Sequence, residues 1–332
     1  MNLKNKKILI TGGTGTIGSA LVEELLKFAP SVIRIFSRDE YKQFQMQHRM
    51  KDHEHVRFLI GDVRDKERLY KAMEDIDIVF HLAAMKHVSS CEYNPFEAVK
   101  TNVLGTQNII DVAIQQNVKH VVFTSTDKAI APTNIYGATK LTAERLITSA
   151  HFHKGKHKTI FSSVRFGNVM GSRGSVIPLF VEQIQRGEAI TVTDPEMVRY
   201  MMTPKQAVQL ILETLRVSQG GEIFVLKMPK IRLQDLIDAI EGLLAERGLL
   251  NVGFEKRVVG LRPGEKMEEE LMTDYEAGIA IDCGNMFCIP SYFGDRKVPD
   301  GKVDSEVYEG LLLDELIDQS TIREWLKSEQ II

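Results

Sequence analysis

A glycine-rich turn between an apolar strand and an amphipathic helix constrains this chain most. Lys7 to Ile10 is a short apolar strand, the turn Thr11 to Gly18 follows it directly, and apolar residues then recur at helical spacing from Leu21 to Leu26. Glycines permit a tight turn whose backbone approaches a ligand closely, and a helix N-terminus attracts a pyrophosphate. The pattern predicts a dinucleotide site. It lacks the Gly-Lys-Ser/Thr ending of a P-loop.

The type of dinucleotide should be decided where the second strand, Val32 to Phe36, ends at Ser37-Arg38-Asp39-Glu40. An acidic residue there binds the ribose hydroxyls of NAD, whereas an arginine accommodates the 2′-phosphate of NADP. Because Ser37 and Arg38 come first, we predict NADP, bound tightly and recycled. Asp39 and Glu40 leave NAD open, and Arg38 could instead be an ordinary solvated loop residue.

Further cofactor contacts are expected at the ends of the third and fourth strands. Asp62 is a candidate for the adenine amino group, and the small residues Ala83 and Ala84 let the backbone pass beneath the cofactor. The predicted cofactor residues are Gly12, Thr14, Gly15, Thr16, Ile17, Gly18, Ser37, Arg38, Asp62, Val63, Ala83, Ala84, Lys86, Tyr136 and Lys140.

Two acid/base couples lie within fifteen residues of each other. Tyr136 and Lys140 are four residues apart, so on a helix both side chains project from one face. A neighbouring ammonium stabilises the phenolate and should lower the tyrosine pKa from about 10. Asp127 and Lys128 form a second couple where a strand should end. Together they indicate more than alcohol oxidation, although the first could be an exposed helix pair and the second a solvated turn.

Alternating strands and helices predict an α/β fold with a Rossmann-type doubly wound parallel sheet and a smaller C-terminal substrate-binding lobe. We expect the dinucleotide-binding domain at 1–168, with later returns near 204–227, and mainly a substrate-binding lobe at 169–332. The Gly/Ser-rich stretch 167–178 is predicted to be a loop. Helices are predicted at 182–186, 204–217 and 233–247, and strands at 189–193 and 222–226.

Composition excludes several classes of protein. The formal net charge is −3 and the isoelectric point is near 6.3, so neither nucleic acid nor a membrane surface is an expected partner. No apolar run approaches the roughly 18 residues of a membrane span. The three cysteines have no zinc-ligand spacing, so no metal is expected. We expect a cytoplasmic enzyme.

At this point the motifs carry a resemblance. The chain resembles the extended short-chain dehydrogenases/reductases and, more narrowly, the C5-inverting UDP-N-acetylglucosamine 4,6-dehydratases that begin pseudaminic acid synthesis. Its Asp127-Lys128 pair is the specific element, because ordinary epimerases of the superfamily lack it and dTDP-glucose dehydratases carry Asp-Glu there. The motifs that carry the resemblance are 11–18, 37–40, 84–88, 92–95, 125–129, 134–140, 165–169, 171–178 and 262–266.

The resemblance implies a reaction and a role for each residue. Oxidation at C4 of the sugar acidifies the C5 proton, water is lost across C5 and C6, and reduction at C6 gives UDP-2-acetamido-2,6-dideoxy-L-arabino-hex-4-ulose. Tyr136 would be the base at C4, with Lys140 as its electrostatic partner and ribose ligand, and Thr126 would bind the C4 oxygen. Asp127 would protonate the leaving C6 hydroxyl, and Lys128, partly neutral, would be the base at C5.

The resemblance also implies contacts to the nucleotide sugar. The candidates are Lys86, Asn168, Arg173, Ser175, Val176, Thr191, Arg199, Arg262 and Glu265. Arg199 and Arg262 could instead be surface ion-pairing residues, and Glu265-Lys266 and Glu268 to Glu270 could form a solvated helix start. His87 receives no role. The chain departs from the family pattern at Val198, where Thr is usual, and at Phe166, where Tyr is common.

Alternatives remain open at this stage. C5-retaining relatives share the Asp-Lys pair but tend to be membrane-anchored with Met at the position of Tyr136, so we expect the inverting type. An enzyme that releases the 5,6-ene, a UDP-sugar 4-epimerase and a non-catalytic NADP sensor are the other possibilities, and complete acid/base couples argue against the sensor. A homo-oligomer is expected, with helices 97–116 and 136–151 as its dimer face.

Overall fold

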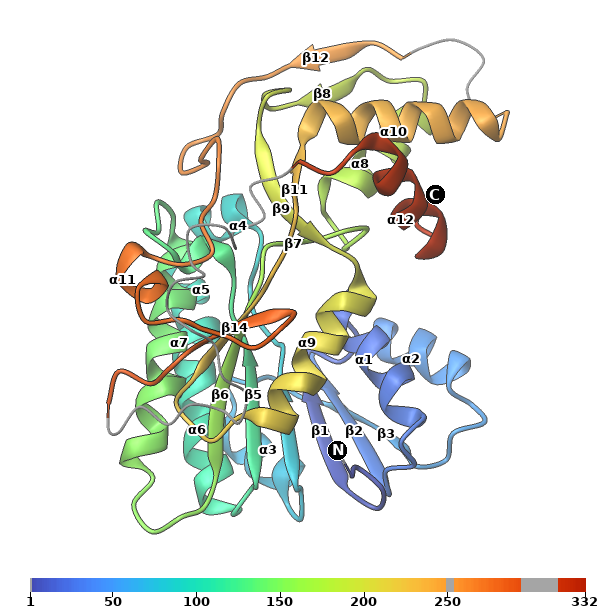
Figure 1. The fold of residues 1–332 in the computed structure, drawn as a ribbon. Helices are drawn as coiled ribbons and strands as arrows, with labels where there is room; N and C mark the ends of the chain where they lie inside the picture. Colours follow the sequence, from blue (N-terminus) through green and yellow to red (C-terminus); the bar gives the residue numbers. More distant parts are fainter. Residues whose placement is uncertain (1, 249–253, 294–315) are drawn as a thin grey trace.

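A nine-stranded sheet forms the centre of the computed structural model, which describes residues 2–248, 254–293 and 316–332 (Figure 1). All neighbouring strands from β3 to β10 run parallel, and β14 and β13 are added antiparallel at one edge. In spatial order the strands are β3 (Val56–Ile60), β2 (Val32–Ser37), β1 (Lys7–Thr11), β4 (Ile78–His81), β5 (His120–Thr124), β6 (Ile160–Arg165), β10 (Ile223–Leu226), β14 (Met286–Ile289) and β13 (Ile281–Asp282). This confirms the predicted Rossmann-type sheet.

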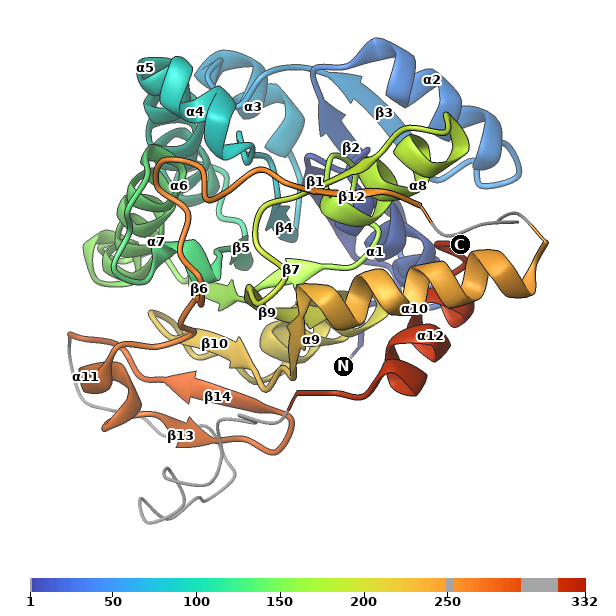
Figure 2. The same cartoon turned by 90° about the horizontal axis from the view of Figure 1, so that it is seen from above.

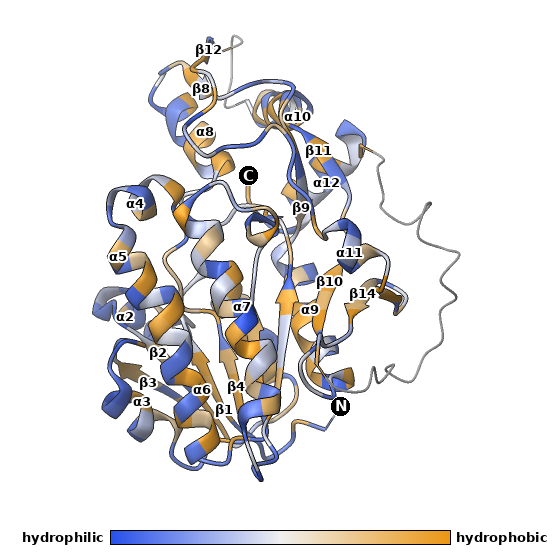
Figure 3. Ribbon diagram, turned by 90° about the vertical axis from the view of Figure 1, so that its left-hand side faces the viewer, coloured by the Kyte–Doolittle hydropathy of each residue, from blue (hydrophilic) through white to orange (hydrophobic). Residues whose placement is uncertain are grey.

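Helices cover both faces of the sheet, which is why its central strands are apolar on both sides. One face packs on α1 (Thr16–Leu26), α2 (Glu40–Arg49) and α9 (Pro204–Val217). The other packs on α3 (Lys66–Met73), α6 (Gly105–Gln115) and α7 (Ile135–His153), and the strands behind these helices are largely hydrophobic (Figure 3). Helix α9 has the predicted bounds because Thr203 and Gln206 form a capping box around Pro204.

A smaller lobe lies over the carboxyl ends of the parallel strands (Figures 1 and 2). Its own core includes Phe180, Ile237 and Ile322. The lobe comprises β7 (Asn168–Val169), α8 (Val176–Gln185), β8 (Ile190–Val192), β9 (Val198–Met202), β11 (Lys230–Arg232), α10 (Leu233–Glu246), β12 (Lys256–Val258) and α12 (Gln319–Ser328).

Short elements complete the described part of the chain. They are α4 (Val88–Tyr93), α5 (Pro95–Ala98), the π-helical turn η1 (Val99–Leu104), the 3₁₀ turn η2 (Asp127–Ala129) and α11 (Asp274–Ala277). No helix in the described ranges is long and apolar enough to cross a membrane.

Two local predictions were wrong. The stretch 167–178 is not all loop, because residues 168–169 pair with β9 as β7, and α8 begins at Val176 rather than near 182. Pro178 is tolerated there because the first turn of a helix needs no N–H donor. No helix begins at Glu268 to Glu270, since α11 begins only at Asp274, after a capping box of Thr273 and Glu276.

A fully buried guanidinium ties the sheet to the segment that follows the lobe. Arg165 at the end of β6 donates to Glu144 of α7 (2.7 Å) and to Glu276 of α11 (2.9 Å). It also donates to the carbonyl of Leu271 (2.9 Å). Although burial raises the pKa of Glu276, the hydrogen bond and charge of Arg165 dominate and lower it to about 2. One arginine therefore joins β6, α7 and residues 271–276.

Replacing Arg165 by Met should strongly destabilise the fold, because two buried carboxylates lose their partner. We expect a loss of about 3–5 kcal/mol in the free energy of unfolding, measured by urea denaturation. The control is Arg216→Met, which breaks the exposed pair with Glu213 on α9 and should cost at most about 1 kcal/mol. Equal effects of the two substitutions would contradict this account.

Candidate active site

A cavity of about 730 Å³ lies between the carboxyl edge of the sheet and the smaller lobe. Its walls come from the glycine-rich turn, the ends of β2, β3, β4 and β5, the start of α7, and the segment 166–177. The structure brings all the predicted cofactor residues to this cavity, namely Gly12, Thr14, Gly15, Thr16, Ile17, Gly18, Ser37, Arg38, Asp62, Val63, Ala83, Ala84, Lys86, Tyr136 and Lys140.

The glycine-rich turn has the form that a pyrophosphate site needs. Gly12 has φ +71°, and a Cβ there would lie 2.8 Å from the backbone nitrogen of Ala83. Gly15 is the N-cap of α1 and provides no side-chain cap, so the first amides of this helix remain available to a ligand at the cavity. The turn therefore fits a dinucleotide in shape and in hydrogen-bonding capacity.

At the end of β2, the carboxylate of Asp39 is directed at its own helix. It accepts the backbone N–H of Lys42 (3.0 Å) as the N-cap of α2 and pairs with the ammonium of the same residue (2.9 Å). These hydrogen bonds lower the pKa of Asp39. Arg38 is more than half exposed and its guanidinium lies 3.7 Å from Asp62. This end of the cavity thus presents an accessible cation.

Tyr136 and Lys140 both reach the cavity from the first turns of α7. The Lys140 ammonium is buried, donates to the carbonyl of Thr124 and lies 3.9 Å from the centre of the Phe123 ring. Burial lowers the pKa of Lys140 to about 7, an effect that Glu144 partly opposes.

We predicted that Lys140 lowers the pKa of Tyr136, and this prediction was wrong for the arrangement in the structure. Burial raises the pKa of Tyr136, and a hydrogen bond with Thr126 opposes this only in part. The physical reason is that the ammonium of Lys140 is bound to the end of β5, where desolvation of the phenol outweighs any stabilisation of the phenolate. At neutral pH Tyr136 is therefore a protonated phenol in this arrangement.

Asp127 and Lys128 sit in η2, directly beyond β5. Asp127 is fully buried, and its Oδ1 accepts from Thr126 Oγ1 (2.9 Å) and from Lys128 Nζ (3.1 Å). Its Oδ2 is buried and has no hydrogen-bond partner among the residues that the structure describes. The alternative of a solvated turn is therefore wrong, because the Asp127 carboxylate is out of contact with water, and burying a carboxylate in this way costs free energy.

The two couples are held against each other by close backbone packing. A Cβ at Gly137, in the first turn of α7, would collide with the carbonyl oxygen of Lys128. The backbone N–H of Asp127 donates to the carbonyl of Phe166 beyond β6 (3.0 Å). Two neighbouring strand ends and one helix start therefore fix the relative positions of the four side chains.

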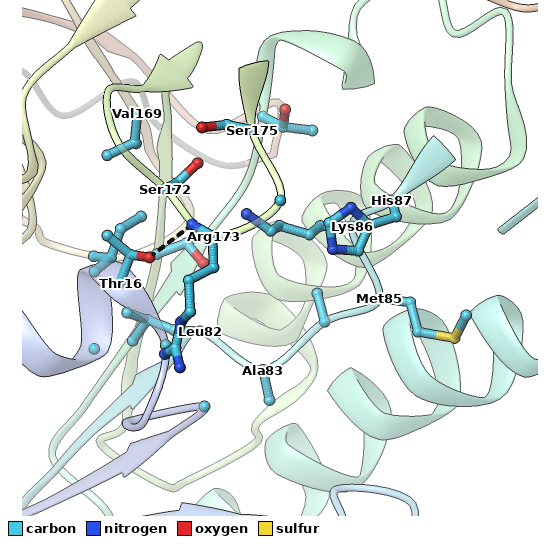
Figure 4. A pocket seen from close by; sticks show the side chains of 18 of the residues that line it. Thr16, Leu82, Ala83, Met85, Lys86, His87, Val169, Ser172, Arg173 and Ser175 are labelled. Carbon is cyan, nitrogen blue, oxygen red and sulfur yellow. Dashed lines mark hydrogen bonds between the residues drawn. The ribbon is translucent and has the colours of Figure 1, made fainter. Parts of the chain in front are cut away.

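The segment 172–175 closes the cavity over the glycine-rich turn (Figure 4). The backbone N–H of Arg173 donates to Thr16 Oγ1 (3.2 Å), and its guanidinium donates to the carbonyl of Thr14. In Figure 4 the Lys86 side chain points across the cavity toward this segment. Burial, together with the charge of Arg173, lowers the pKa of Lys86. These two cations face the side of the cavity that fits a pyrophosphate.

The remaining substrate candidates divide into two groups. Asn168, Ser175 and Val176 line the cavity with Lys86 and Arg173, and Asn168 Oδ1 lies 3.4 Å from Lys128 Nζ. Thr191, Arg199, Arg262 and Glu265 are not brought to its wall. Thr191 bonds Gln183 of α8, Arg199 donates to the carbonyls of residues 198, 266 and 267, and Arg262 is exposed.

Glu269 is a site residue that the sequence prediction missed. It was predicted to lie in a solvated helix start, but its side chain is only 5% exposed and its Oε1 lies 3.5 Å from Lys128 Nζ. Burial and the charge of Asp127 raise the pKa of Glu269, while nearby cations oppose the shift. The run Glu268-Glu269-Glu270 gave no local signal that its middle member is buried.

Comparisons with known proteins agree with this fold. The family described as polysaccharide biosynthesis protein matches residues 8–291. An uncharacterized membrane protein of Methanocaldococcus jannaschii is 51% identical over 290 residues, which are 87% of each chain. The crystal structure of Pen from Bacillus thuringiensis is 51% identical, covers 99% of this chain and 100% of its own, and superposes with a TM-score of 0.89.

Relatives with a named activity fall into two types. An inverting UDP-N-acetylglucosamine 4,6-dehydratase of Campylobacter jejuni is 41% identical over 286 residues, 86% of this chain and 82% of its own. A UDP-glucose 4-epimerase of Rickettsia bellii is 40% identical over 290 residues, 86% of this chain and 83% of its own.

Proposed function

The chain belongs to the polysaccharide biosynthesis protein family, and we propose that it is a UDP-N-acetylglucosamine 4,6-dehydratase that uses NADP. The observation that carries the proposal is the Asp127–Lys128 couple: Lys128 lines the same cavity as Tyr136, and the fully buried Asp127 is bonded to Lys128 and Thr126. A simple alcohol oxidation needs one proton acceptor, whereas removal of water also needs an acid and a base placed at adjacent carbons.

The residues of the chain supply each proton transfer of this reaction. When bound, NADP would supply the redox chemistry of the reaction: oxidation of the sugar at C4 and, later, reduction at C6. Tyr136, which hydrogen-bonds Thr126, is a protonated phenol in this structure, so it accepts the C4 hydroxyl proton as a phenolate after its own proton has passed to solvent. The ketone acidifies the C5 proton, which Lys128 removes. Asp127 Oδ2, the oxygen without a partner in the described structure, holds the proton that leaves with the C6 hydroxyl.

The nucleotide sugar is proposed from chemistry and from the relatives together. The inverting dehydratase of Campylobacter jejuni acts on UDP-N-acetylglucosamine, and this chain covers 82% of it. Lys86, Asn168, Arg173, Ser175 and Val176 line the same cavity as Lys128. We propose inversion at C5, in the synthesis of pseudaminic acid or a related surface glycan, in a cytoplasmic homo-oligomer.

A UDP-sugar 4-epimerase is the second candidate, because Rickettsia relatives with that name are about as similar as the dehydratases. An epimerase uses Tyr136 and Lys140 in the same way and has no role for a base at C5. In an epimerase, burying Asp127 beside Lys128 with one carboxylate oxygen unpartnered among the described residues would cost folding free energy and would serve no step of the reaction. We therefore favour the dehydratase.

Substituting Lys128 by Ala separates the two candidates. In a dehydratase it should abolish formation of the 6-deoxy product, by at least about 100-fold, while C4 oxidation still reduces the cofactor in a single turnover at 340 nm. In an epimerase it should leave C4 epimer formation near the wild-type rate. The control is Lys119→Ala, because Lys119 is exposed and pairs with Asp77 at the opposite edge of the sheet.

The preference for NADP is proposed from the end of β2. Arg38 is accessible there, 3.7 Å from Asp62, and the carboxylate of the next residue, Asp39, is engaged by Lys42 as the N-cap of α2. An arginine–phosphate contact of this kind contributes about 1.5–3 kcal/mol.

Arg38→Ala should therefore weaken NADP binding by roughly 10–100-fold and change NAD binding little, as measured by isothermal titration calorimetry on cofactor-stripped protein. Arg49→Ala, at the exposed end of α2, is the matched control. Tighter binding of NAD than of NADP by the wild-type protein would refute the preference.

A further inference from the structure

The segment that follows the turn at Gly264 brings the carboxylate of Glu269 to Lys128. Arg199 anchors this segment, because its guanidinium donates to the carbonyls of Lys266 (2.7 Å) and Met267 (2.9 Å). Lys266 Nζ donates to the carbonyl of Ile130, just beyond η2 (3.1 Å). Two residues beyond Glu269, the carbonyl of Leu271 is bound by Arg165. The position of Glu269 is therefore fixed from both sides.

Lys128 has three acceptors around its Nζ. Asp127 Oδ1 lies at 3.1 Å, Asn168 Oδ1 at 3.4 Å and Glu269 Oε1 at 3.5 Å. Only about a fifth of the Lys128 side chain is exposed. The contacts with Asp127 and Asn168 are hydrogen bonds, and the contact with Glu269 is an ion pair.

A neutral amine has two N–H donors and one lone pair, so it can keep only two of these contacts as donor. Asp127 Oδ1 is the nearest of the three oxygens, and Glu269 approaches Nζ from a separate segment of the chain. Lys128 and Asn168 line the cavity, whereas Glu269 is not among the residues that line it. With Asp127 and Glu269 as its partners, the neutral amine would have its lone pair on the side of Nζ that faces Asn168 and the cavity.

We propose that Glu269 is a positioning residue. It anchors Lys128 so that the lone pair of Lys128 Nζ faces C5 on one side of the sugar ring. The inference rests on the proposed dehydratase activity and adds a residue to it. In the step itself, the C5–H bond breaks, the proton passes to the lone pair of Lys128, and the electrons form the enolate of the 4-ketone. The C6 hydroxyl then leaves as water with the proton of Asp127. After the hydride returns to C6, a proton from solvent reaches C5 on the face opposite to Lys128, as inversion requires, and Lys128 releases to solvent the proton that it took.

The test compares Glu269→Ala with Glu270→Ala, a neighbouring exposed glutamate. Two half-reactions are measured with UDP-N-acetylglucosamine: reduction of bound NADP in a single turnover, and formation of the 6-deoxy product with solvent deuterium at C5. Glu269→Ala should slow the second by about 100-fold, the usual cost of misplacing a catalytic group by about 1 Å. The first half-reaction and KM should change less than about threefold, so reduced cofactor accumulates. Glu270→Ala should match the wild type.

A second variant guards against a folding defect. Glu269→Gln keeps the side-chain length and an acceptor oxygen, so it should form product within about tenfold of wild type. Product formation by Glu269→Ala at the wild-type rate overturns the proposal, as does equal loss of both half-reactions, or a Gln variant as slow as the Ala variant. If the wild-type protein forms no 6-deoxy product, the dehydratase itself fails, and the role of Glu269 fails with it.

Discussion

The buried guanidinium of Arg165 is the interaction on which the rest of the site depends. It neutralises Glu144 of α7 and Glu276 of α11, neither of which could stay ionised in this interior alone. Its bond with Glu144 holds α7, which is the helix that carries Tyr136 and Lys140. Its bond with the carbonyl of Leu271 holds the segment that contains Glu269, which lies near Lys128. The sheet, helix α7 and the segment 271–276 are thus joined by one guanidinium.

The parallel sheet does the remaining placement. Because neighbouring parallel strands end at one edge of the sheet, residues 126–128, which follow β5, lie next to the residues that follow β6. Gly137 lets the start of α7 lie directly on η2. Backbone packing therefore fixes the positions of the two acid/base couples, and their side chains can come into contact with little rotation. This is the preorganisation that the proposed proton transfers at adjacent carbons require.

The sequence predicted best what depends on local pattern. The glycine-rich turn, the strand ends and the bounds of α9 follow from spacing and capping, so the sheet and the cavity wall could be foreseen. Glu269 could not, because its burial arises from contacts with Lys128 and Asp127, far away in the sequence. The shift at Tyr136 was also missed, since the four-residue spacing to Lys140 does not reveal that Thr124 takes the ammonium.

The central claim is that Asp127 and Lys128 remove water from a nucleotide sugar. Proton NMR of the wild-type protein incubated with UDP-N-acetylglucosamine in D2O tests it most directly. The account predicts a new C6 methyl signal, deuterium at C5 and the coupling constants of an L-arabino ring. A methyl signal with the original C5 configuration would contradict inversion alone. A C4 epimer without a methyl signal, or unchanged substrate, would contradict the assignment of both residues.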